Sequence, residues 1–142
     1  MGTGATFAND LLKLIFNAVA IGNIADNAGS SPITNLYAAL HTADPSAGDQ
    51  TTNEIAYSTY ARVAILRTSG GWLVTGMSVS PVADIEFPAA SSGDSGTAPY
   101  FSIGKSSTGA GKILYAGKLS PSIAISSGVA PTITSASTVT ES

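Results

Sequence analysis

The feature that most constrains the fold is the stretch 35–65, in which two alternating segments flank a long polar one. Residues 36–41 alternate between two sets of side chains, and residues 60–67 do so again, which is the period-two pattern of half-buried strands. An Asp-Pro dipeptide ends the first segment, because proline lacks a backbone donor and aspartate favours turns. Residues 42–53 contain no large apolar side chain and are predicted to form a surface loop. With so long a loop, the two strands need not form a tight hairpin and can belong to different sheets.

Short strands separated by turn residues are predicted for the rest of the chain. Beyond the first two, they cover residues 72–76, 83–87, 100–104, 112–119, 122–126 and 131–135. No helical pattern lies between these segments, so the crossovers that a parallel sheet requires are missing. The sequence therefore predicts a mainly β fold, an antiparallel jelly-roll or β-sandwich of about eight strands.

One α-helix is predicted before the strands, over residues 7–21. Its apolar residues recur at helical spacing and cover most of its circumference, so we expect burial on more than one side. Thr6 or Asn9 can cap its start, and Gly22 suits its end. Two packings are open: against the sheet edge of its own domain, or partly against a neighbouring subunit.

A chain of 142 residues predicts a single domain, 1–142. We expect the helix at 7–21, the β-sandwich at 35–135 and a flexible tail at 136–142. Three polar segments, 22–34, 42–53 and 88–98, are expected to be mobile before a partner binds, because few apolar side chains anchor them.

Composition excludes several classes of partner. Charged residues make up 11% of the chain, against about 25% in an average protein, which favours a protein that packs against something. Nucleic acid is not expected, since the net charge is −3 and the six basic residues are scattered. No membrane partner is expected either, because the apolar stretch 11–21 is too short to span a bilayer. The absence of cysteine excludes disulfides and thiolate chemistry.

The single histidine limits the catalytic possibilities. A multi-histidine metal site is impossible within one chain. A Ser-His-Asp arrangement would have to use His41, with Asp44 close in sequence, and no Gly-x-Ser-x-Gly motif is present. Because catalytic residues usually come from separate elements, we interpret His41 as a strand-end residue that hydrogen-bonds the turn 42–45.

The segment 104–113 has some similarity to a phosphate-binding loop. Ser106 stands where the first glycine of that motif belongs, and Ile113 replaces the metal-binding hydroxyl. A predicted strand follows the segment instead of a helix. We interpret it as a flexible loop between two strands.

Acidic residues offer two further candidate sites. Asp44, Asp49 and Glu54 could ligate calcium, but their spacing matches no known loop motif, so solvated carboxylates are the preferred interpretation. Asp84 and Glu86 lie on one face of a predicted strand, about 7 Å apart by strand rise. An acid–base pair at that separation is conceivable, although two carboxylates on a wet face are more common.

Aromatic and basic residues complete the search. Trp72 and the five tyrosines could form a sugar-binding platform, but in a small protein they more often fill the core and its rim. Arg62 and Arg67 are expected to pair with carboxylates or loop carbonyls. We therefore predict no catalytic, cofactor-binding or metal-binding residue, no cofactor, and no enzymatic activity.

Four motifs, in this order, resemble small virion proteins of tailed bacteriophages. They are LYAALHTADP at 36–45, YSTYAR at 57–62, SGGW at 69–72, and FSIG at 101–104 followed by GKILY at 111–115. Together with the N-terminal helix they cover most of residues 7–126. The family that they resemble is that of capsid cement or decoration proteins with a jelly-roll fold, and similar sequences also carry tail-fibre labels.

The resemblance implies a structural protein that binds and stabilises the exterior of a bacteriophage capsid. It implies the major capsid protein as a partner, and self-association as a dimer or trimer. It also implies a location on the capsid surface of the virion, after synthesis in the cytoplasm of the host bacterium. The alternative is a tail-associated or fibre-tip module that binds a receptor or glycan.

Overall fold

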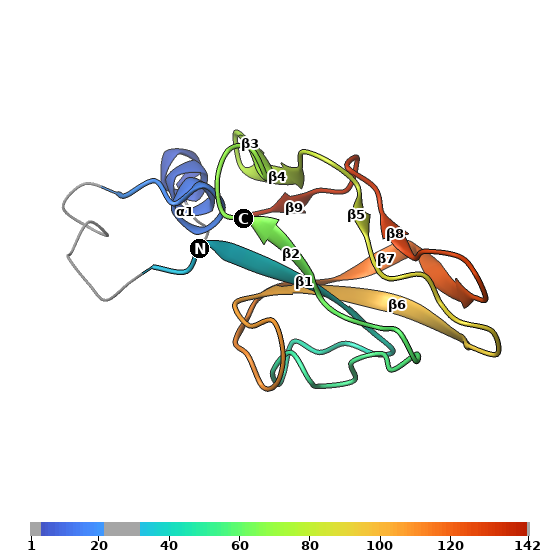
Figure 1. Ribbon diagram of the computed structural model, residues 1–142. Coiled ribbons are helices and arrows are strands. Elements are labelled where there is room, and N and C mark those ends of the chain that lie inside the picture. Colours follow the sequence, from blue (N-terminus) through green and yellow to red (C-terminus); the bar gives the residue numbers. More distant parts are fainter. Residues whose placement is uncertain (1–3, 22–31, 142) are drawn as a thin grey trace. The chain divides into compact units, whose positions relative to one another are not determined.

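The computed structural model describes residues 4–21 and 32–141 (Figure 1). The described residues form one N-terminal helix and nine strands in three antiparallel sheets, which confirms a mainly β fold consistent with the predicted β-sandwich. The elements are α1 (Ala5–Asn17), β1 (Asn35–His41), β2 (Val63–Leu66), β3 (Trp72–Thr75), β4 (Ser78–Pro81), β5 (Ile85–Glu86), β6 (Ser95–Gly104), β7 (Ile113–Ser126), β8 (Thr132–Ile133) and β9 (Val139–Thr140).

Contacts within the chain divide it into two compact units. Unit 1 comprises Met1–Asn35, Leu66–Asp84 and Thr134–Ser142, and unit 2 comprises Leu36–Ile65 and Ile85–Ile133. Each unit therefore combines segments that are far apart in the sequence.

Unit 1 packs helix α1 on a small sheet. Strands β3 and β4 form a hairpin that turns at Gly76, whose φ of 60° suits glycine, and β9 pairs with β4. The buried face of α1 contains Leu12 and Phe16, and the Phe16 ring meets Trp72 edge-on with centroids 4.7 Å apart. This aromatic pair forms part of the core of unit 1.

Helix α1 starts and ends earlier than the sequence predicts. Gly4 occupies the N-cap without a side-chain hydrogen bond, so the expected capping by Thr6 or Asn9 is wrong. Asn9 instead donates to the carbonyl of Gly76 in the hairpin turn. At the other end Ala18 takes a left-handed conformation, and Gly22, the predicted stop, lies outside the described residues.

Arg67 explains why the helix stops before residue 21. Its Nε donates to the carbonyl of Ile15 at 2.6 Å, and its Nη2 donates to that of Leu14 at 2.5 Å. These carbonyls belong to the last turn of the helix, which has no intrahelical partners for them. A cation at the negative end of the helix is also favourable.

Unit 2 is built around a four-stranded sheet with the order β2-β1-β6-β7 (Figure 1). Strand β1 runs antiparallel to β6, with Tyr37 opposite Gly104 and His41 opposite Tyr100. Strands β5 and β8 form a second, two-stranded sheet. Strand β1 is almost entirely buried, which places its last residue, His41, at the end of the sheet and away from solvent.

Several predicted boundaries differ from the observed strands. The predicted strand 60–67 is shorter, as β2, and β4 was not predicted at all. Residues 95–98, predicted as loop, belong to β6 because they pair with the second half of β7. The predicted strands 112–119 and 122–126 are one strand, β7, with a cis peptide bond at Ser120-Pro121.

The segments on either side of the predicted sandwich also need comparison with the structure. The segment 136–142, expected to be a flexible tail, contains β9, and this strand pairs with β4. Most of the predicted loop 22–34 lies outside the described residues. Long-range pairing, which local composition does not encode, decides the structure of the C-terminal segment.

Candidate functional site

A buried polar network lies in unit 2 at the end of β1. Two segments meet there: residues 42–53, here called loop A, and residues 105–111, here called loop B, which joins β6 to β7. The amide of Gln50 in loop A donates to the carbonyl of Gly111 in loop B at 2.9 Å. The network therefore joins two loops that are more than 50 residues apart in the chain.

Arg62 is the centre of this network. Its side chain is only 3% exposed and makes a bidentate ion pair with Glu54, with both N–O distances at 2.7 Å. The same guanidinium donates to the carbonyls of Ser106 at 3.0 Å and Gly109 at 2.9 Å in loop B. These contacts are of the two kinds expected from the sequence, and they use the planar fork that only arginine offers.

Tyr60 connects the ion pair to the sheet. Its hydroxyl donates to Glu54 Oε1 at 2.9 Å and accepts the amide of Leu40 in β1 at 3.1 Å. Burial is the largest cause that raises the pKa of Tyr60, so its hydroxyl stays protonated. Tyr60 therefore acts as a neutral bridge from β1 to the carboxylate.

Gln50 fills the space between the two loops. It is fully buried, and its Oε1 accepts the amide of Ser106 at 3.0 Å. A Cβ atom at Gly104 or at Gly111 would overlap the Gln50 side chain, so both positions require glycine for close approach. Gln50 Nε2 is buried without a hydrogen-bond partner among the described residues.

His41 holds loop A against the sheet. Its side chain is fully buried, with Nδ1 2.9 Å from the carbonyl oxygen of Thr52 and Nε2 2.8 Å from Ser102 Oγ. A carbonyl only accepts, so Nδ1 carries the proton and Nε2 accepts the hydroxyl of Ser102. Burial is the main reason why the pKa of His41 is lowered from 6.5. The predicted partner, the turn 42–45, is wrong: the ring bonds to the far end of loop A and to β6.

The contact of Ser102 with His41 was not predicted. Its geometry is that of a nucleophile and a base, but both side chains have no exposed surface for a substrate to reach. The carbonyl of Thr52 occupies the place where a triad carboxylate would bind. Only the pairing of β1 with β6 brings the two residues together, and no local motif around Ser102 signals it.

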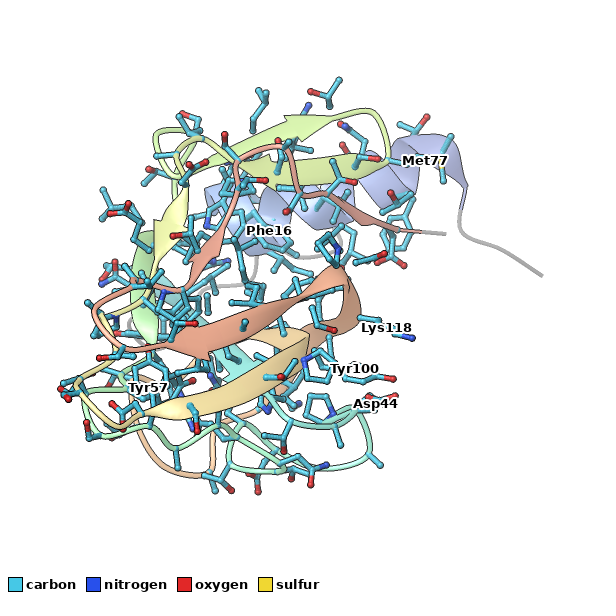
Figure 2. The ribbon with its side chains drawn as sticks, turned by 90° about the vertical axis from the view of Figure 1, so that its right-hand side faces the viewer. Phe16, Asp44, Tyr57, Met77, Tyr100 and Lys118 are labelled. Carbon is cyan, nitrogen blue, oxygen red and sulfur yellow. The ribbon has the colours of Figure 1, made fainter. Side chains whose placement is uncertain are left out.

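Asp44 lies in an exposed turn on the outside of unit 2, where Figure 2 labels it. Its Oδ1 accepts the amide of Ser46 at 2.9 Å, and Asp49 Oδ1 accepts the amide of Thr51 at 2.8 Å. Such hydrogen bonds lower the pKa of both aspartates. Glu54, the third candidate calcium ligand, binds Arg62. Within the described residues, no three acidic or histidine side chains are grouped as a metal site.

Asp84 and Trp72, two further candidates from the sequence, have structural contacts. Asp84 and Glu86 belong to different units, and Asp84 Oδ1 accepts the amide of Ser135 at 2.7 Å. Trp72 is 2% exposed and fills the core of unit 1, as the sequence predicts. Loop B is followed by strand β7, as its dissimilarity to a phosphate loop predicts.

A pocket of about 250 Å³ opens beside the ion pair. It is lined by Glu54, Tyr60, Ala61, Arg62, Ser107, Thr108 and Gly109. The charged groups in this lining already bind each other and loop B. The chemistry that the network supports is therefore the positioning of two loops on a sheet.

The fold and the network together define a class: a mainly β protein in which a buried polar network joins two loops to a sheet. The model of the family described as podophage GP4 fiber I protein gp80 matches residues 3–141, almost the whole chain. The chain therefore belongs to this family, and it is a structural protein of a bacteriophage virion. A search of curated proteins found no match.

This result refines the resemblance seen in the sequence. It supports a phage virion protein, and the family description names a fibre where the motifs resembled capsid cement proteins. Helix α1, the one helix among the described residues, is not long and apolar enough to cross a membrane.

Proposed function

We propose that this chain is a structural subunit of a fibre on a podophage virion. The observation that carries the proposal is the extent of the family match, 3–141, which includes both units and every described element. A match over almost the whole chain supports the role of the family, whereas a short match could come from one domain that unrelated proteins share.

Exposed apolar side chains on unit 1 support the proposal that this chain packs against other subunits. Large apolar side chains are exposed there, between 41% and 59%: Phe7, Val19, Ile33, Leu66, Leu73 and Val82. Exposed large apolar side chains of this kind can be buried by contact with another subunit. Self-association of the chain as a dimer or trimer, expected from the sequence, is part of this proposal.

Cryo-electron microscopy of the virion tests the proposal directly. We expect density for this fold in a fibre that projects from the particle. The motif resemblance favours a second candidate, binding to the major capsid protein on the capsid exterior, and density there would replace the first proposal. A particle without this chain would overturn both.

A glycan-binding role at a fibre tip has less support. Trp72, the residue on which a sugar platform would depend, is buried against Phe16. The pocket beside Arg62 is lined by charged groups that already have partners. A glycan array in which the purified chain binds a defined sugar would revive this alternative.

We also propose that the chain is not an enzyme. Ser102 and His41, the only serine–histidine contact in the described part of unit 2, have no exposed surface. A broad hydrolase screen should detect no activity. Activity that disappears in a His41→Ala variant, with the fold retained, would overturn this proposal.

A further inference from the structure

We propose that His41 is an acid-sensitive latch, whose protonation releases loop A from the sheet of unit 2. The inference rests on the geometry of the His41 ring and is independent of the proposed fibre function.

The ring of His41, which belongs to β1, connects the C-terminal end of loop A to strand β6. Nδ1 binds the carbonyl of Thr52, and Nε2 binds Ser102 in β6. Backbone bonds at the same place join Thr42 to Asn53 at 2.8 Å and Ile55 to Leu40 at 3.0 Å. The side chain of His41 is thus the one titratable group that bonds loop A directly to β6 among the described residues.

Protonation changes the hydrogen bond to Ser102 and places a charge on a buried ring, while the bond from Nδ1 to the carbonyl of Thr52 is kept. The neutral ring donates once and accepts once, which matches a carbonyl on one side and a hydroxyl on the other. The imidazolium donates twice, so Ser102 has to stop donating and turn its hydroxyl elsewhere. The positive charge would also lie fully buried at the end of β1. Opening of loop A relieves both costs, because water then reaches the ring.

The charged groups around the ring do not remove this cost. Glu54 favours protonation of His41 and Arg62 opposes it, and these two side chains form an ion pair with each other. Tyr60, bonded to Glu54, is neutral. The hydrogen bond to the carbonyl of Thr52 also favours protonation, but burial is the largest influence and the pKa of His41 is lowered from 6.5.

The sign of the pH effect follows from that direction. The pKa in the closed loop lies below the ordinary value of 6.5, so the closed loop has its full stability above that pH. As the pH falls below it, the open form binds the proton first, and the closed form loses stability until the pKa of the closed state is passed. Asp44 and Asp49 stay ionised over this range because hydrogen bonds lower their pKa.

Amide hydrogen exchange of the full chain between about pH 7.5 and about pH 5, corrected for intrinsic rates, tests the latch. The reporters are the amides of Thr42 and Ile55, which bond at the base of loop A, and of Gln50, which bonds loop A to loop B. Their protection should fall by up to about tenfold for each pH unit below the ordinary histidine value. Amides of β3 and β4, in unit 1, serve as the internal control and should change little.

A His41→Gln variant is the matched control, since glutamine donates and accepts but does not titrate in this range. Its loop protection should not depend on pH. Unchanged protection in the unaltered chain, or the same fall in His41→Gln, would overturn the latch.

A second measurement keeps the test decisive if His41→Gln fails to fold. Nitrogen NMR of the unaltered chain should show a proton on Nδ1 at neutral pH, and shifts of the loop A amides should follow the titration of His41. A proton on Nε2 instead, or a His41 pKa of 6.5 or above, would contradict the proposal.

Discussion

At the scale of single residues, the arginine fork is the contact on which loop packing depends most. Arg62 binds Glu54 through two of its nitrogens and also two carbonyls of loop B. Arg62→Ala leaves a largely buried carboxylate without its counter-ion and removes the donor from two carbonyls. We expect a loss of about 3 kcal/mol in the free energy of unfolding, measured by urea denaturation.

Lys105→Ala is the matched control for this variant, because Lys105 is an exposed cation in loop B. It should change stability by less than about 0.5 kcal/mol. A similarly small change for Arg62→Ala would show that the ion pair does not hold the loops.

The glycines around Gln50 give a second prediction at this scale. A methyl group at Gly111 would overlap Gln50 and Ser106, so Gly111→Ala should cost about 1–3 kcal/mol in a urea unfolding experiment. Gly70→Ala is its control, since the nearest atom there, at 3.5 Å, is at ordinary contact distance. Adding Gln50→Ala to Gly111→Ala should restore part of the loss, and equal effects at the two glycines would contradict the overlap.

The sequence predicts some of these residue contacts and not others. The pairing of Arg62 follows from its chemistry, because a buried guanidinium needs carboxylates or carbonyls. The burial of Gln50 and the contact of Ser102 with His41 could not be predicted, since both depend on β1, β6 and the two loops coming together. Nothing in their local sequence distinguishes them from surface residues.

At the scale of elements, helix α1 is held by Arg67, a residue more than 50 positions later in the chain. Arg67→Ala removes the donors that satisfy the carbonyls of Leu14 and Ile15. We expect the last turn of α1 to fray and unit 1 to lose about 1–3 kcal/mol. Hydrogen exchange of the amides in the last turn of α1 measures the fraying.

Lys118→Ala, at an exposed position in β7, should leave the exchange of those α1 amides unchanged. An Arg67→Ala variant with full protection in the last turn of α1 would show that Arg67 does not cap the helix.

This contact also shows why the end of the helix was predicted less well than the position of strand β1. The apolar pattern of the helix continues to residue 21, but the helix ends at Asn17, because Arg67 binds its last carbonyls and Ala18 turns left-handed. Strand β1, in contrast, was predicted at its observed position, because local alternation and an Asp-Pro dipeptide define it.

At the scale of the whole molecule, the sequence predicts the fold class and a phage virion protein, but it does not predict two units. Unit 1 combines the N-terminal helix, a central hairpin and the C-terminal strand β9. Local composition suggested a tail at residues 136–142, since a strand as short as β9 carries almost no periodic signal. Its pairing with β4 is a long-range contact that only the folded chain shows.

The exposed apolar side chains of unit 1 predict which unit contacts the rest of the virion. Leu73 in unit 1 is 58% exposed, and Val129 in unit 2 is 52% exposed, which makes them a matched pair. We expect Leu73→Asp to reduce the amount of this chain in purified particles several-fold, and Val129→Asp to have little effect. Quantitative mass spectrometry of the particles measures both, and the opposite order would assign the contact to unit 2.

The low charge of the chain predicts how its assembly responds to salt. Charged residues are 11% of the sequence, and Arg62, Arg67 and Glu54 are already engaged within the chain. Contacts to the virion should therefore be mainly apolar and main-chain, and such contacts are not screened by ions. We expect particles washed at about 0.05 M and at about 1 M salt to retain this chain to the same extent, because only the charged contacts weaken as the Debye length shrinks. A steep loss of the chain at high salt would show that exposed charges such as Asp44 and Lys105 form the contact instead.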